Sequence, residues 1–405
     1  MRTLDLAREL GPDLIDLRRR LHRIPEIGLR LPLTQALLLE ELAGLDLEVS
    51  TGESLDSIVA VLRGRGGSRT GTDRPVVLLR GDMDALPVTE EVKSDYRSEH
   101  EGAMHACGHD LHMAGLLGAV RILHAMRAEL EGDVVFMLQP GEEGPGGAEP
   151  MIAEGLLEAA GRRVDAAYAL HVYSATYPRG TFFGRPGTLM AGCDEVSVRV
   201  VGRGGHGSAP EKCLDPIPVA CEMVTALQAM VARRFSIWDP VVVTVGKIAG
   251  GTKENIIPDD CTWEATVRTF SLENRALAAR AIPELARSIA AAHGLTAEVD
   301  WVTGYSPTVN EPGEWARVEQ AVADLFGADR LAIMPDPEAG GEDFSFVADQ
   351  VPAAYVDLSA AVDDPDARED NHSPRAAFDD SVVPDAAALL AELAVRRLRE
   401  LASVD

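Results

Sequence analysis

Cysteine, histidine and aspartate gather in one short stretch of the chain, MHACGHDLH at 104–112. Cys107 and His109 are separated by one glycine, and Asp110 begins a predicted helix. A thiolate and an imidazole this close together can bind the same metal ion. A group of partly exposed loop histidines would give the same pattern, so a Cys-x-His pair alone is a weak signal.

A pair of adjacent glutamates, Glu142 and Glu143, directly follows the predicted strand 133–139 in the sequence QPGEEGPGG. Two neighbouring acids can divide the chemistry, because one can bind a metal ion while the other transfers protons. A solvated acidic turn is the commoner origin of such a pair, so these residues also need support from the rest of the chain.

Three further stretches carry candidate side chains. His171 ends an apolar strand, Asp82 and Asp84 follow another strand at a spacing of two, and His372 lies in a turn after an acidic loop. Each has an ordinary explanation, such as a core histidine with satisfied hydrogen bonds. Together they place histidine, cysteine and acidic residues at the C-terminal ends of successive predicted strands, where α/β folds build their sites.

The elements that must position these residues follow an α/β pattern. Short apolar runs predict buried strands at 75–80, 133–139 and 165–171. Helical patterns cover 13–23, 34–43, about 110–130 and 384–401. Continuous apolar strands separated by helices indicate a sheet that is covered on both faces.

The pattern changes near Cys193. Residues 195–201 alternate between apolar and polar, which predicts a sheet with one face in water. The order that follows is β-α-β-β-α-β, the ferredoxin-like split unit, from strands at 195–201, 240–248, 261–270 and 296–302 and helices at 215–234 and 272–293. We therefore predict a catalytic α/β domain from 1–192 and 304–405, interrupted by an inserted domain at 193–303.

Length and charge limit the classes of function. A chain of 405 residues suits two domains, and its 65 acidic against 38 basic residues give a net charge of -27. Such a surface repels nucleic acid and anionic membranes. The charged N-terminus resembles no targeting segment, and no apolar run approaches a membrane span. We expect a cytoplasmic protein with reduced thiols, since an odd number of cysteines lacks framework spacing: Cys107, Cys193, Cys213, Cys221 and Cys261.

Taken in order, the candidate stretches resemble the metallopeptidase family of aminoacylases, specifically its hippurate hydrolase and auxin-conjugate amidohydrolase branch. The matching segments span almost the whole chain: GDMDALP, MHACGHD, QPGEEGPGGA, ALHV, GRGGHGSAP, ENIIPDD, TVRTF, GGEDFS and NHSPRAAF. The resemblance implies a metal-binding α/β domain with an inserted ferredoxin-like lid, in agreement with the predicted organisation. One departure is Ile24-Pro25-Glu26, where the family often carries His-Pro-Glu.

The resemblance also implies a role for each matching residue. Two divalent ions, zinc or manganese, would be held by Cys107, His109, Glu143, His171 and His372. Glu142 matches the general base, and Asp84 matches an acid that orients the base or a ligand histidine. In the lid, His206 matches a residue that stabilises the oxyanion, often supplied by a partner subunit. Asn255 and Arg268 match groups that hold the substrate carboxylate.

These observations predict a homodimeric, metal-dependent amidohydrolase that cleaves N-acyl amino acids. A dipeptidase or a deacetylase of an amino-acid precursor is the closest alternative. A thiol hydrolase with Cys107 as nucleophile and His109 as base is a second class. A non-catalytic metal-binding protein is a third, which the free acid at Glu142 disfavours.

Overall fold

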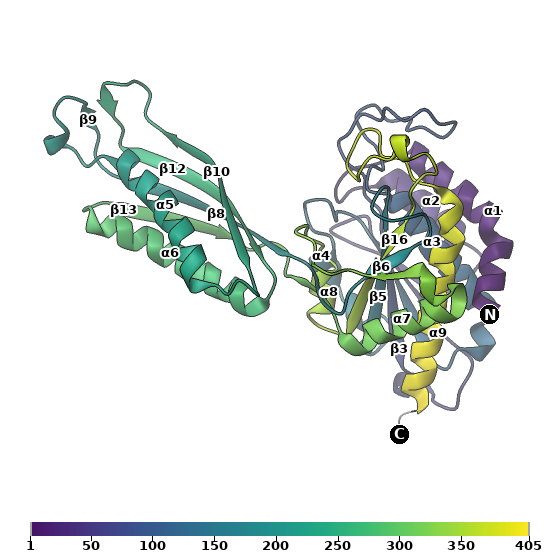
Figure 1. Ribbon diagram of the computed structural model, residues 1–405. Coiled ribbons are helices and arrows are strands. Elements are labelled where there is room, and N and C mark those ends of the chain that lie inside the picture. The colour runs from purple at the N-terminus through teal and green to yellow at the C-terminus, as the bar shows by residue number, and fades with distance from the viewer. Residues whose placement is uncertain (1, 404–405) are drawn as a thin grey trace. The chain divides into compact units, whose positions relative to one another are not determined.

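The computed structural model describes residues 2–403 (Figure 1). The chain forms two compact units. Unit 1 comprises Met1–Gly187, Val309–Pro335 and Phe346–Asp405, and unit 2 comprises Thr188–Thr308 and Asp336–Ser345. Unit 2 therefore begins and ends a few residues outside the predicted insertion at 193–303. It also includes residues 336–345, which the sequence prediction had left in the outer domain.

Unit 1 is built on a mixed sheet, with eight strands within the described residues in the order β1-β2-β4-β3-β5-β16-β6-β15. Strands β4, β3, β5 and β16 run parallel to one another at its centre. Their bounds are Asp133–Gln139 (β4), Val76–Asp82 (β3), Ala166–Tyr173 (β5) and Ala353–Ser359 (β16). The outer strands are Glu48–Thr51 (β1), Ile58–Leu62 (β2), Phe182–Gly184 (β6) and Leu331–Ile333 (β15). Parallel strands bring their C-terminal ends to one edge, so the polar residues that follow them can meet there.

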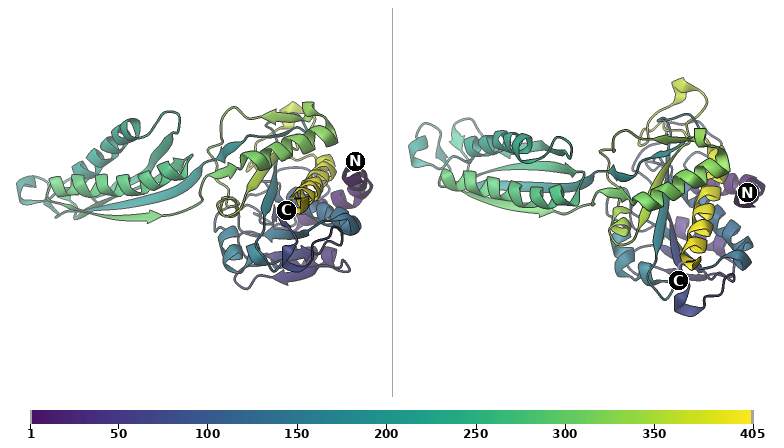
Figure 2. Two further views of the ribbon diagram at one scale, coloured as in Figure 1. Left: turned by 90° about the horizontal axis from the view of Figure 1, so that it is seen from below. Right: turned by 60° about the horizontal axis from the view of Figure 1, so that its bottom comes forward.

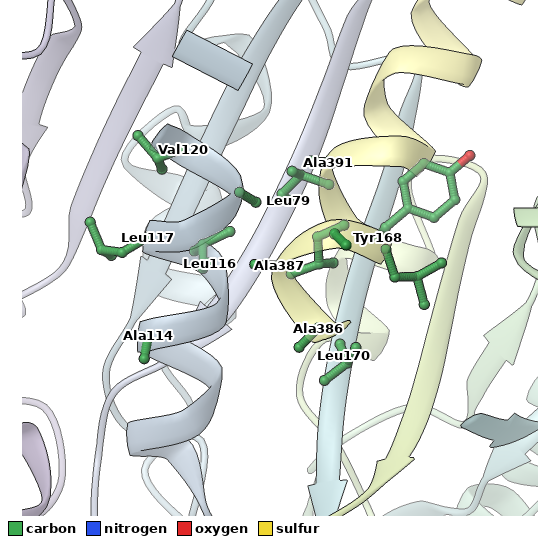
Figure 3. Packing of buried hydrophobic residues seen from close by; sticks show 14 of the residues in the cluster. Leu79, Ala114, Leu116, Leu117, Val120, Tyr168, Leu170, Ala386, Ala387 and Ala391 are labelled. Carbon is green, nitrogen blue, oxygen red and sulfur yellow. The ribbon is translucent and has the colours of Figure 1, made fainter. Parts of the chain in front are cut away.

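Helices α1 (Arg2–Arg23), α3 (His109–Ala125) and α9 (Val383–Ser403) pack together against this sheet. Figure 3 shows side chains from α3, α9 and the strands in this core. A Cβ added at Gly118 of α3 would lie 2.6 Å from the Cβ of Ala387 in α9. Small residues at this contact let the two helices approach closely, which fixes the position of α3. The other helices that accompany them are α2 (Pro32–Leu42), α4 (Ala148–Ala153), α7 (Pro312–Phe326) and α8 (Ser345–Ala348).

For two helices of unit 1, the predicted bounds were wrong. Helix α1 begins at Arg2 rather than 13, because the helix continues through Pro12. Gly11 lies against Pro384, whose Cγ would be 3.2 Å from an added Cβ, so tertiary packing supports the turn that the Gly-Pro pair weakens. Helix α3 ends at Ala125, and a 3-10 turn follows at Arg127–Glu129.

Unit 2 has the predicted β-α-β-β-α-β order, as β8 (Gly192–Val201), α5 (Pro216–Arg234), β10 (Val241–Gly250), β12 (Asp260–Thr269), α6 (Leu272–Ala292) and β13 (Thr296–Val302). The strands form an antiparallel sheet in the order β10-β12-β8-β13. Both helices pack on one face (Figures 1 and 2), over a core around the buried Trp263. Asp215 and Ser271 cap the starts of α5 and α6 with their side chains. The predicted ferredoxin-like arrangement is confirmed.

The remaining strands are short. Strands β9 (Gly205–His206) and β11 (Ile256–Ile257) pair at one end of unit 2. Strands β7 (Gly187–Met190) and β14 (Thr308–Asn310) lie where the chain passes between the units. Within the described part of the chain, no helix is both long and apolar enough to span a membrane.

Candidate metal centre

The predicted metal ligands of unit 1 come together in space. Three overlapping groups each keep their possible ligand atoms within 4.8 Å of one another. They are Cys107 with His109 and His171, Cys107 with Glu143 and His372, and His109 with Glu142 and Glu143. All five predicted ligands and the predicted base therefore lie in one cluster, although they are spread over the sequence from 107 to 372.

Distances within the cluster match those between ligands of a tetrahedral ion. The Cys107 Sγ lies 3.3 Å from His171 Nε2. The Glu143 Oε1 lies 3.4 Å from His372 Nε2 and 3.7 Å from His109 Nε2. Ligand atoms at zinc-like bond lengths of about 2.0–2.3 Å stand roughly 3.3–3.8 Å apart in a tetrahedral site. The donor set, a thiol with imidazoles and a carboxylate, also suits a divalent transition metal.

Several polar atoms of the cluster are buried without a hydrogen-bond partner among the described residues. They are both ring nitrogens of His109, the Nδ1 of His171 and the Oε1 of Glu143. Leaving such an atom unsatisfied costs about 1–3 kcal/mol each. A bound cation would accept the Glu143 oxygen and the lone-pair nitrogen of each imidazole, so the residues present fit a metal centre.

The protonation of the cluster follows from its burial and its charges. Burial and the negative charge of Glu143 raise the pKa of the Cys107 thiol to about 12. Burial, reinforced by His112, holds the pKa of His171 well below its usual value, so this imidazole is neutral and able to donate a lone pair. Burial opposes ionisation of Glu143, but the close contact with His372 and the charge of His109 lower its pKa overall.

The pKa of His109 is shifted in the opposite direction from that of His171. Burial acts to lower the pKa of His109, but the charge of Asp82 and the contact with Asp84 raise the pKa well above the usual value. A cation that binds His109 must therefore displace a proton from it. The same holds for Cys107, whose pKa is also raised, so metal binding to this cluster releases protons.

Asp84 supports the two glutamates through their backbone. Its Oδ1 accepts the N–H of Glu142 at 3.0 Å, and its Oδ2 accepts the N–H of Glu143 at 3.1 Å. The Oδ1 also lies 3.6 Å from His109 Nδ1. Asp84 is fully buried, so one carboxylate ties the end of β3 to the loop after β4 and to α3.

His372 is held by the turn that contains it. Its backbone has φ 72°, which is rare for a residue other than glycine, and its N–H donates to the Ala106 carbonyl at 2.9 Å. The neighbouring Asn371 donates from Nδ2 to the Val172 carbonyl at 3.0 Å and to the Cys107 carbonyl at 3.3 Å. Asn371 thus links this turn to the cysteine loop. It stands beside His372 in the sequence, and that adjacency was the only available signal for it.

The three predicted substrate-binding residues do not come together within unit 2. His206 on β9 pairs with Ile256 on β11, and the Asn255 carbonyl accepts the N–H of Gly207 at 2.9 Å. Arg268 lies near the opposite end of β12, where it pairs with Cys193. About eight residues of extended strand, at roughly 3.4 Å each, separate these two ends.

Comparison with known proteins identifies the family of this chain. Residues 78–396 match the model of peptidase family M20/M25/M40. The chain belongs to this family. Its M20 relatives include a protein named IAA-amino acid hydrolase ILR1-like 2 from Arabidopsis thaliana, 34% identical, with 96% of this chain and 86% of that protein covered. A protein named N-acetyldiaminopimelate deacetylase from Halalkalibacterium halodurans is 38% identical, with 85% and 89% covered.

A solved structure agrees with both the fold and the cluster. A Bacillus subtilis protein, described as a dinuclear metal binding peptidase from the M20 family, superposes with a TM-score of 0.82. It is 30% identical, and the match covers 97% of this chain and 99% of that chain. This M20 chain is therefore a hydrolase of amide bonds from a metal-binding family, and the resemblance inferred from its motifs is confirmed.

Proposed function

We propose that this M20 protein hydrolyses the amide bond of N-acyl amino acids, including hippurate-like substrates. The observation that carries the proposal is the buried cluster in which one glutamate faces two histidines and its neighbour provides a second carboxylate. A site that only stored metal would not need that second acid. The relative named as a hydrolase of IAA-amino acids supports an acyl group on one side of the bond and an amino acid on the other.

Two divalent ions, zinc or manganese, would be held by the five predicted ligands: Cys107, His109, Glu143, His171 and His372. When bound, the ions supply an activated water and polarise the scissile carbonyl. The remaining steps belong to the side chains of the protein. Glu142 takes the proton of the attacking water and delivers it to the leaving amine, which Glu143 cannot do while it serves as a ligand.

The inserted domain would complete the site as a lid. His206 would donate a hydrogen bond to the developing oxyanion. Arg268 would hold the substrate carboxylate, aided by Asn255, because a guanidinium binds carboxylates bidentately and the protein is otherwise strongly acidic. Since His206 and Asn255 lie at the opposite end of the lid sheet from Arg268, one small substrate cannot reach all three in one chain. We therefore propose a homodimer in which each site draws on both copies.

Two rival functions within the family differ only in substrate. The relative named as a deacetylase of an amino-acid precursor supports one, and a dipeptidase is the other. The deciding experiment compares turnover of N-acyl amino acids, N-acetyl precursors and dipeptides by the metal-loaded protein. Hippurate-like substrates should have the highest kcat/KM. Absence of turnover of any N-acyl amino acid would refute the proposal.

A thiol hydrolase is disfavoured by the electrostatics of the cluster. The reactive form of cysteine is the thiolate, and burial beside Glu143 raises the pKa of Cys107 to about 12. A nucleophilic cysteine would need the opposite shift. Activity that survives complete chelation and is lost on alkylation would favour the thiol mechanism instead.

A further inference from the structure

A buried polar network lies beneath the predicted ligands and uses residues to which the proposed reaction assigns no role. Arg80 on β3 donates from Nη1 to Asp82 Oδ2 at 2.6 Å and from Nε to Gln139 Oε1 at 3.0 Å. The other carboxylate oxygen of Asp82 lies 2.5 Å from His112 Nδ1. Arg80 and Asp82 are fully buried and His112 is nearly so, which makes their hydrogen bonds costly to leave unmade.

The hydrogen bonds fix the tautomer of His112. The backbone N–H of Val172 donates to His112 Nε2 at 2.8 Å, so Nε2 carries the lone pair. The proton is then on Nδ1, which donates it to Asp82. Possible ligand atoms of Asp82, His109 and His112 do lie within 4.8 Å of one another. Both nitrogens of His112 are nevertheless committed, so this group is not a further metal site.

The ring of His112 contacts two predicted ligands, which also meet each other edge to face with 6.1 Å between their ring centroids. Its centroid is 5.2 Å from that of His109, with the rings 30° apart, and 4.6 Å from that of His171. Helix α3 can approach β3 this closely because Gly81 has no side chain. A Cβ there would lie 3.2 Å from the His112 carbonyl oxygen. His112 thus packs against both ligand rings, and Asp82 locks it in one orientation.

We propose that Asp82 and His112 are positioning residues, which hold the rings of the ligand histidines His109 and His171 in place and in orientation. The inference rests on the proposed function, because it takes those histidines as ligands. Asp82 acts on His171 through His112 and the Val172 N–H, and on His109 directly, with 3.6 Å between Asp82 Oδ2 and His109 Nε2. Loss of such outer contacts typically lowers metal affinity about 10- to 100-fold.

The test replaces the locked ring by one that packs equally well but makes neither hydrogen bond, His112→Phe. The matched control is Tyr168→Phe, which removes another buried hydrogen bond on β5, from Tyr168 to Glu314. Cobalt(II) is titrated into the metal-free full-length protein against a competing chelator. The visible absorption bands of the bound cobalt(II) are recorded as a measure of ligand geometry.

We expect the unchanged protein to take up two equivalents of cobalt(II). H112F should bind at least one of them about 10- to 100-fold more weakly and with altered bands, whereas Y168F should leave both readouts unchanged. If H112F does not fold, His112→Gln, which can still accept the Val172 N–H, should show the same loss in milder form.

Wild-type affinity and bands in the folded His112 variants would overturn the inference while leaving the proposed function intact. A third equivalent of cobalt(II) that disappears in H112F would also overturn it, because His112 would then be a ligand. Absence of cobalt(II) uptake by the unchanged protein would refute the proposed metal centre, and this inference with it.

Discussion

The two carboxylate oxygens of Asp84 accept the backbone N–H groups of Glu142 and Glu143, at 3.0 and 3.1 Å. The loop that presents these glutamates is tightly folded, because a Cβ at Gly147 would lie 1.7 Å from the Pro140 carbonyl oxygen. Asp84 therefore sets the place of the proposed base relative to the proposed ligand next to it. Through these two hydrogen bonds, an acid that follows β3 positions residues that follow β4.

Replacing Asp84 by alanine should loosen this arrangement. Two backbone N–H groups would lose their acceptor, and the orientation of both glutamates would become less defined. We expect kcat to fall about 10- to 100-fold, with a similar loss in metal affinity. Steady-state kinetics and metal titration of D84A measure both effects. Asp84→Asn, which keeps one acceptor oxygen, should lie between D84A and the unchanged protein, and equal activity in all three would contradict the role.

The pH dependence of metal binding should report the two raised pKa values in the cluster. Because Cys107 and His109 hold protons at neutral pH, a cation must displace them, and affinity should increase as pH rises. The pKa of Glu143 is lowered, so this residue is already ionised and does not contribute to the pH dependence of metal affinity. We expect about a tenfold gain in affinity per pH unit for each proton released, across about pH 6 to 8.

A cysteine variant separates the contribution of the thiol. Cys107→Ser should weaken zinc binding and flatten the pH dependence, since no proton is then displaced from sulfur. The exposed Cys221 provides the control, and C221S should behave as the unchanged protein. A slope that C107S leaves unaltered would show that the thiol does not bind the metal.

Complementation between variants tests the proposed sharing of sites. His206→Ala and Arg268→Ala should each reduce kcat/KM strongly as homodimers. Mixed dimers should regain activity, because one of their two sites then carries both an intact His206 and an intact Arg268. This holds whether a site takes its His206 or its Arg268 from its own subunit. Mixing and refolding the two variants, followed by assay, gives the result. Absence of any recovery in confirmed mixed dimers would argue against shared sites.

The close contact between α3 and α9 predicts a stability effect away from the chemistry. Gly118→Val would place a branched side chain 2.6 Å from the Ala387 Cβ and 2.7 Å from Leu14, and should cost about 2 kcal/mol or more. Gly246→Val is the control, because nothing lies within 4 Å of a Cβ at that position. Thermal unfolding should show a clearly lower Tm for G118V only.

The sequence predicted those parts of the site that depend on where a residue stands relative to a strand. Residues directly after apolar strands, such as Asp84 and Glu143, could be grouped because parallel strands end at one edge of a sheet. His171 and His372 needed the family resemblance, since a histidine that ends a strand has no local mark of a ligand. The contact between them and the cysteine loop arises only from tertiary packing, through Asn371.

The parts that were missed depend on long-range contacts. The first helix was predicted only over 13–23, but it starts at Arg2 and continues through Pro12, where Gly11 packs on Pro384 near the other end of the chain. Asp82 was noted only for its spacing, and His112 only as part of a histidine-rich stretch. Their hydrogen bond, between β3 and α3, cannot be read from either segment alone.

The central claim is the division of labour between Glu142 and Glu143, and Glu142→Gln tests it most directly. The amide keeps the shape of the side chain but cannot accept the proton of the attacking water. We expect kcat to fall about 10²- to 10⁴-fold. Metal analysis of the same preparation should still find two ions per chain, as in the unchanged protein. Near-normal turnover, or loss of metal together with activity, would contradict the account.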